Sequence, residues 1–118
     1  MKSIISLVLC LTLLSAVATA AAIDREKIRQ VVKKHEKDIR ACYESQLTKE
    51  PNLSGKLVVD WDIDDEGKVL NAAVNANSTD LKNAAVAGCV IKHLQTWTFP
   101  VAAKGEKVSV TYPWSFSN

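Results

Sequence analysis

Apolar residues recur along this chain with two different periods. From residue 28 to residue 47, apolar side chains and one histidine follow helical spacing. They are Ile28, Val32, His35, Ile39, Cys42, Tyr43 and Leu47. From residue 56 to 63, and again from 107 to 117, apolar side chains occupy every second position, as in strands with one buried face.

Two helices are predicted from these patterns. The first is expected to run without interruption from a cap at Asp24 to about Thr48, shortly before a proline. The second follows a cap at Ser78 or Asp80 and ends near Thr96, with small and apolar residues at helical spacing between them.

Three strands are predicted, two before the second helix in the sequence and one after it. The first covers Lys56 to Ile63, and the acidic turn Asp64–Gly67 joins it to a returning strand from Lys68 to Asn77. The last strand, Lys107 to Ser117, contains Pro113, which has no N–H to donate and should therefore lie at a sheet edge or in a bulge. One face of the last strand carries Val108, Val110, Tyr112, Trp114 and Phe116.

The element order therefore reads α-β-β-α-β. This order predicts an α+β fold, in which a three-stranded antiparallel sheet has both helices packed on one face. We expect one domain, residues 23–118, with no internal repeat and no linker.

The first residues have the features of a secretory leader. Lys2 supplies a positive start, an apolar run extends from Ile4 to Leu14, and Ala18-Thr19-Ala20 matches a cleavage site. We expect a signal peptide over residues 1–20, with cleavage after Ala22 as the alternative. The mature chain would then be periplasmic or secreted.

The sequence contains three cysteines, and cleavage of the leader would remove Cys10. An even pair in an exported chain favours a disulfide between Cys42 and Cys89. The same residues permit a zinc site with His35 and His93, although no C-x-x-C spacing supports it. A catalytic dithiol is a further alternative, but such cysteines are usually close in sequence. We therefore expect no metal and no cofactor.

Composition narrows the function further. Of 118 residues, 15 are basic and 13 acidic, a net charge of +2 that is too small for a dedicated nucleic-acid binder. Nucleotide-binding and nucleophile-elbow motifs are absent from the sequence, so we propose no catalytic residue and expect a protein that is not an enzyme.

Two charged groups have both an ordinary and a functional interpretation. Asp60, Asp62 and the acidic turn fit a solvated strand face. The alternatives are calcium binding, although an EF-hand spacing is lacking, and a pair of carboxylates for hydrolysis. A basic row on the first helix fits a solvated face or weak association with an anionic envelope surface. The row consists of Arg25, Arg29, Lys33 and Lys37.

Several short motifs occur in a characteristic order along the mature chain. They are Cys42-Tyr43-Glu44, Pro51-x-Leu53-x-Gly55-Lys56, Gly67-x-Val69, Cys89-Val90, Trp97-x-Phe99-Pro100 and Tyr112-Pro113-x-x-Phe116. Together they resemble the AgmX/PglI C-terminal domain, a member of the TonB-like C-terminal domains. The resemblance covers about Ile28 to Phe116 and implies a periplasmic, non-enzymatic interaction domain.

TonB relatives hold a short peptide by adding it as a strand to the sheet, typically at the third strand. The resemblance transfers this role to the last strand here, with partner-binding residues Val108, Val110, Tyr112, Pro113, Trp114 and Phe116. TonB relatives also carry a membrane anchor and a proline-rich spacer, which this sequence does not show. We therefore expect an envelope protein or peptide as partner, bound without a membrane anchor of its own. The alternative is a secreted structural or inhibitory protein that forms a homodimer through its sheet edge.

Overall fold

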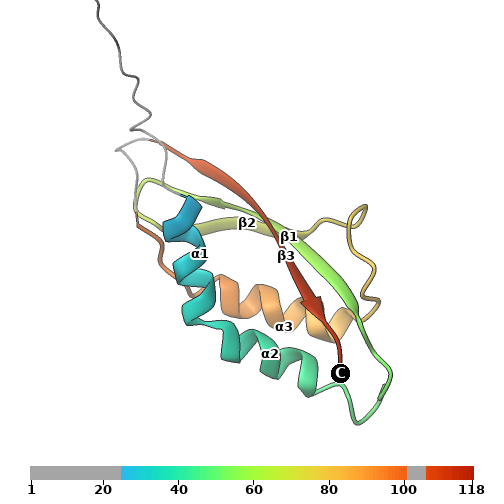
Figure 1. The fold of residues 1–118 in the computed structure, drawn as a ribbon. Coiled ribbons are helices and arrows are strands. Elements are labelled where there is room, and N and C mark those ends of the chain that lie inside the picture. Colours follow the sequence, from blue (N-terminus) through green and yellow to red (C-terminus); the bar gives the residue numbers. More distant parts are fainter. Residues whose placement is uncertain (1–24, 101–105) are drawn as a thin grey trace, which may run out of the picture.

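The computed structural model describes residues 25–100 and 106–118 (Figure 1). Its elements, in order, are α1 (Arg25–Lys34), α2 (Glu36–Glu44), β1 (Gly55–Ile63), β2 (Val69–Val74), α3 (Ala84–Leu94) and β3 (Val108–Phe116). The expected leader and the predicted cap at Asp24 lie outside the described residues.

The three strands form one antiparallel sheet in the order β2-β1-β3. Figure 1 shows the helices together on one side of this sheet, with α2 and α3 side by side. The structure therefore confirms the predicted α+β fold and its two layers. β1 lies in the centre, and β3 lies at an edge, as the proline in the last strand predicts.

The core fills the space between the helices and the sheet. Alternate residues of β1, namely Leu57, Val59, Trp61 and Ile63, are almost fully buried. They meet apolar residues of all three helices in one cluster. This alternation is the predicted one, because successive strand side chains point to opposite faces.

The first helical segment is not continuous, contrary to the prediction. It breaks at His35, whose φ of −105° and ψ of 13° separate α1 from α2. The His35 N–H bonds to the carbonyl of Val32, three residues back, which tightens the turn locally. The His35 ring stacks on Trp97 at 4.4 Å, so a tertiary contact that local sequence does not reveal accompanies the break.

α3 begins later than predicted, because the proposed caps have another role. Its cap is Asn83, whose side-chain oxygen accepts the N–H of Val86 at 2.9 Å. Asp80 instead accepts the N–H of Lys56, and Thr79 bonds both backbone groups of Val58. The segment before α3 thus continues the sheet edge beyond the end of β2.

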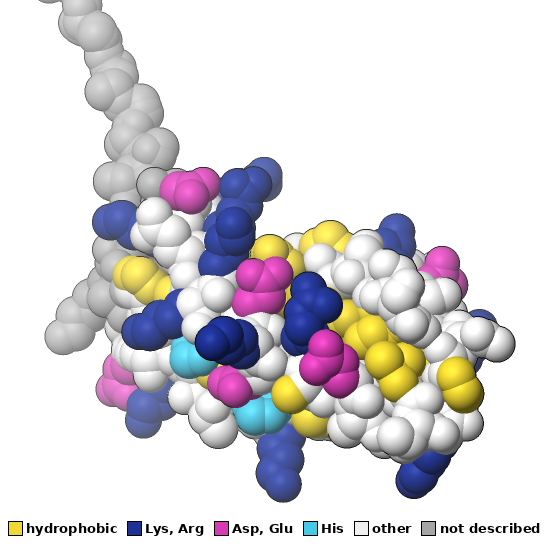
Figure 2. All heavy atoms as spheres, turned by 60° about the horizontal axis from the view of Figure 1, so that its bottom comes forward, with side chains coloured by type: hydrophobic (Ala, Val, Ile, Leu, Met, Phe, Trp, Pro, Cys, Tyr) yellow, Lys and Arg dark blue, Asp and Glu magenta, His cyan; other side chains and the backbone are white. Residues whose placement is uncertain are grey.

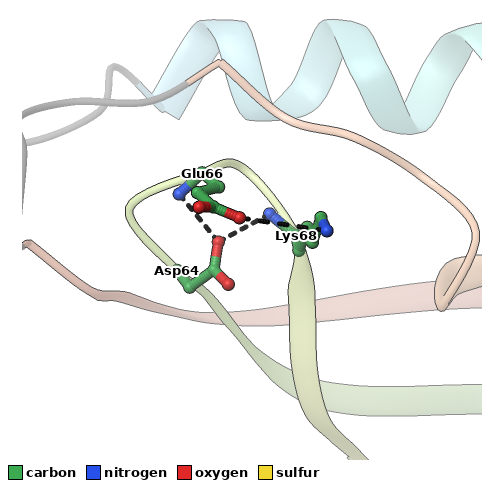
Figure 3. A network of polar contacts seen from close by, with 3 residues as sticks. All are labelled: Asp64, Glu66 and Lys68. Carbon is green, nitrogen blue, oxygen red and sulfur yellow. Dashed lines mark hydrogen bonds and ion pairs between the residues drawn. The ribbon is translucent and has the colours of Figure 1, made fainter.

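The hairpin between β1 and β2 is stabilised by its own acidic residue (Figure 3). Asp64 Oδ1 accepts the backbone N–H groups of Glu66 and Lys68 at 2.8 and 2.9 Å, and these bonds lower the pKa of Asp64. Gly67 has a φ of +84°, and a Cβ there would lie 2.2 Å from the carbonyl oxygen of Phe99. The turn therefore requires glycine, as its position in the predicted hairpin indicates.

β2 is shorter than the predicted strand and carries a bulge. The register with β1 shifts between Asp60 and Asp62, and Asn71 has a φ of +55° opposite this shift. Asparagine tolerates this left-handed conformation better than most residues. The shift keeps Ala72 and Val74 packed against the core.

Candidate functional site

Among residues 25–100 and 106–118, β3 pairs with a strand on one side only, the side of β1. Val58 and Lys56 of β1 bond to the segment 75–81, so their backbone groups point away from β3. Their register partners on β3, Pro113 and Ser115, must likewise point their backbone groups away from β1, because opposite residues of an antiparallel pair share the same bonding state. By alternation, Ser109 and Thr111 do the same.

The outer edge of β3 therefore presents a regular row of backbone groups. Four carbonyls, from residues 109, 111, 113 and 115, and three N–H groups, from residues 109, 111 and 115, point outward. Within the described part of the chain, no other strand pairs with this edge. Such a row can accept a further strand.

Pro113 interrupts the row of donors. Its backbone nitrogen points outward, where it breaks no bond to β1, and it lies opposite Val58. This placement explains how proline is tolerated inside a nine-residue strand. An added strand would find one donor missing near the C-terminal end of the edge.

The helix-facing side of β3 changes along its length. Trp114 and Phe116 are 7% and 8% exposed and belong to the core, whereas Val108, Val110 and Tyr112 are only half buried. Of the six residues that the resemblance suggested for partner binding, Trp114 and Phe116 are thus occupied in packing. The N-terminal half of the strand leaves apolar surface accessible.

The half-buried tyrosine rests on an aromatic cluster. The ring centroid of Tyr112 lies 4.9 Å from that of Trp114 and 6.5 Å from that of Trp61. The rings of Trp61 and Trp114 are stacked, with their centroids 6.2 Å apart. Trp61 is 1% exposed, so the cluster extends into the core. Tyr112 consequently packs on this aromatic cluster beside the outer edge of β3.

The opposite face of the sheet is polar and links β3 to β1 through side chains. The Thr111 hydroxyl donates to Asp60 at 2.6 Å, and the Ser109 hydroxyl donates to Asp62 at 2.7 Å. Hydrogen bonds from Asn71 and Ser109 hold the pKa of Asp62 below its usual value, and the Lys107 ammonium, 4.0 Å away, acts in the same direction. Asp60 and Asp62 thus lie on the outward face, as predicted.

Sequence reasoning missed two features of this outward face. Val58 lies on it yet is only 4% exposed, because the segment 75–81 runs beside it and Pro113 lies opposite. The run of small polar residues before α3 was assigned to a helix cap, and no local signal separates a cap from an extra edge segment.

The predicted disulfide is present. Cys42 of α2 and Cys89 of α3 are bonded, with their Cα atoms 5.7 Å apart. Of the two histidines considered for a metal site, His93 lies beside the sulfur atoms, whereas His35 stacks on Trp97. The four-residue zinc site considered from the sequence is therefore not brought together.

The basic row lies in a mixed surface. Arg25, Arg29, Lys33 and Lys37 are exposed on α1 and α2, and Arg29 pairs with Glu26 at 3.3 Å. Figure 2 shows Lys and Arg side chains on this helical side with Asp and Glu among them. The arrangement fits a solvated face.

Comparisons with known proteins add no relative. The chain matches no protein-family model, and searches of curated proteins and of solved structures found no significant match. Over residues 25–100 and 106–118, no helix has the length and apolar character needed to cross a membrane.

Proposed function

We propose that this protein is an exported, non-enzymatic binding module of the TonB-like C-terminal domain type, which recruits an extended segment of an envelope protein or peptide along the outer edge of β3. The observation that carries the proposal is the outward row of backbone groups on β3, next to half-buried Val108, Val110 and Tyr112. The disulfide supports folding in an oxidising compartment such as the periplasm or the extracellular space.

The two faces of β3 predict the order of apolar and polar residues in the partner segment. A strand added to β3 continues the pleat, so its side chains alternate between the helix-facing side and the polar side. Apolar residues would contact Val110 and Tyr112, and small polar residues would lie beside Ser109 and Thr111. A partner segment of alternating apolar and polar residues therefore fits best.

Pro113 favours a different chain as partner over a second copy. When two β3 edges pair with each other across this region, each contributes its proline, so two donors are missing from the new ladder. A heterologous strand meets only one missing donor. Self-association through the sheet edge, as in a structural or inhibitory protein, remains the second candidate, because in each copy no strand of the described residues pairs with this edge.

The test uses one position on the outward row. Peptides selected from a random library against the oxidised protein serve as probes, and amide chemical shifts locate their binding. Thr111→Pro removes an outward N–H and should weaken binding at least about tenfold, since one hydrogen bond and the fit of a neighbouring strand are lost. Thr111→Val is the matched control, because it loses the hydroxyl bond to Asp60 but keeps the N–H.

Two outcomes separate the alternatives. Shifts confined to residues outside 105–117, or equal binding by the proline and valine variants, would exclude this edge as the binding site. A mass that doubles with concentration in light scattering, and that Thr111→Pro returns to the monomer value, would instead support self-association.

A further inference from the structure

Three potential metal ligands meet between α2 and α3. The sulfur atoms of Cys42 and Cys89 and a ring nitrogen of His93 all lie within 4.8 Å of one another. His93 follows Cys89 by one helical turn on α3, so both side chains project from the same face. Cys42 faces it from α2, which packs beside α3.

We propose that the Cys42–Cys89 disulfide is the oxidised form of a zinc site, in which reduction frees both thiols to bind one Zn²⁺ together with His93. Two thiolates and one imidazole are ligands that zinc prefers, with a water molecule in the fourth position. In the oxidised state the sulfurs are bonded to each other, so neither is a thiolate that can bind a metal.

The required rearrangement is small. In a tetrahedral site with Zn–S bonds of about 2.3 Å, two sulfurs lie about 3.8 Å apart. The Cα atoms of Cys42 and Cys89 lie 5.7 Å apart, a distance at which rotation about the two Cα–Cβ bonds brings the thiol sulfurs to that separation. The helices need not separate.

Access to the site is one-sided. Cys42 is 2% exposed and closes the inner side, whereas Cys89 and His93 are only partly buried. A reductant can therefore approach Cys89, and the metal's water ligand can face solvent. A fully buried pair would permit neither.

A dithiol can reduce the Cys42–Cys89 disulfide by thiol–disulfide exchange. Its thiolate attacks one sulfur of the disulfide, its second thiol resolves the mixed disulfide, and two electrons and two protons pass to Cys42 and Cys89. The reductant leaves as a disulfide. Zinc then replaces the two thiol protons, which go to water. Re-oxidation by a disulfide oxidant reforms the crosslink and releases Zn²⁺, so crosslink and zinc exclude each other.

The experiment compares the oxidised and reduced forms of the protein. A water-soluble phosphine reduces the disulfide, taking its oxygen from water, and Co²⁺ is then added as a spectroscopic probe. The reduced protein should develop a thiolate-to-cobalt charge-transfer band that saturates at one Co²⁺ per chain and disappears when Zn²⁺ is added. The oxidised protein should show no such band. Failure of the reduced protein to develop the band would overturn the proposal.

The two histidines provide a matched pair of variants. In the reduced state His93→Ala should weaken Zn²⁺ binding at least about tenfold, as loss of even an outer-shell partner does at zinc sites. His35→Ala should bind Zn²⁺ as the unsubstituted chain does, because His35 stacks on Trp97 instead. Equal affinities in the two variants would mean that His93 is no ligand and would refute the site.

Far-ultraviolet circular dichroism resolves the case in which reduction unfolds the chain. Refolding on addition of one equivalent of Zn²⁺, lost in His93→Ala, supports the site because ligand binding is then coupled to folding. Unfolding that Zn²⁺ does not reverse counts against it.

Discussion

Reduction of the Cys42–Cys89 disulfide should lower the stability of the domain strongly. The crosslink joins residues 47 positions apart, and the chain-entropy relation for a loop of this length gives about 4 kcal/mol at 25 °C. Domains of this size usually have only about 5–15 kcal/mol in total. The crosslink is therefore expected to supply a large fraction of the free energy of unfolding.

The assay is urea unfolding followed by tryptophan fluorescence, with and without a phosphine reductant. Trp61, Trp97 and Trp114 are 1%, 4% and 7% exposed, so all three report on the core. A chelator in both samples removes any contribution from metal. The corresponding thermal midpoint should fall by roughly 15–30 °C, from about 4–8 °C per kcal/mol in a domain of this size.

The control is the double variant Cys42→Ala/Cys89→Ala, whose unfolding the reductant should leave unchanged. If the reduced and oxidised wild-type proteins differed by less than about 1 kcal/mol, the entropic reasoning would be refuted. The helices would then be held together by packing alone.

Three further predictions concern other parts of the fold. Gly67→Ala should destabilise the protein by at least about 1–2 kcal/mol in thermal unfolding, because φ is +84° and the new Cβ meets the backbone oxygen of Phe99. Gly88→Ala is the control: its Cβ would point into open space from α3, so it should stabilise the protein by up to about 1 kcal/mol. Because the pKa of Asp62 is lower in the folded state, the unfolded state binds a proton at this carboxylate at a higher pH than the folded state does. The free energy of unfolding should therefore fall as the pH drops below about 3.8. Urea titrations at several pH values should show a weaker pH dependence for Asp62→Asn. Tyr43→Phe should cost about 1–3 kcal/mol in urea unfolding, since the buried carbonyl of Leu53 loses its donor; no loss would show that water replaces the hydroxyl.

Two of the three strands, β1 and β3, could be predicted well because their pattern is local. β1 and β3 alternate in the sequence as they do in the sheet, and Pro113 alone restricts β3 to an edge or a bulge. The disulfide followed from cysteine parity and expected export. These signals depend on the chain itself and need no knowledge of distant contacts.

The errors arose where a distant contact overrides the local preference. His35 lies within a helical pattern without proline or glycine, and its ring stacks on Trp97, sixty-two positions away, where the helix breaks. Asp80 is a good helix cap by type, yet the N–H of Lys56 occupies it. Likewise, no pattern could show that Trp114 is buried whereas Tyr112 is only partly buried, because that depends on how far the helices extend over β3.

The position of the crosslink divides the sheet into two parts of unequal resistance to opening. The covalent ring from Cys42 to Cys89 encloses β1 and β2, whereas β3 lies outside it. When β3 detaches, its residues therefore recover their full conformational entropy. The backbone amides of β3 should exchange with solvent sooner than those of β1. An incoming strand could take its place against β1 while the ring keeps the rest of the molecule intact, so exchange of C-terminal strands between two copies is a route open to this topology.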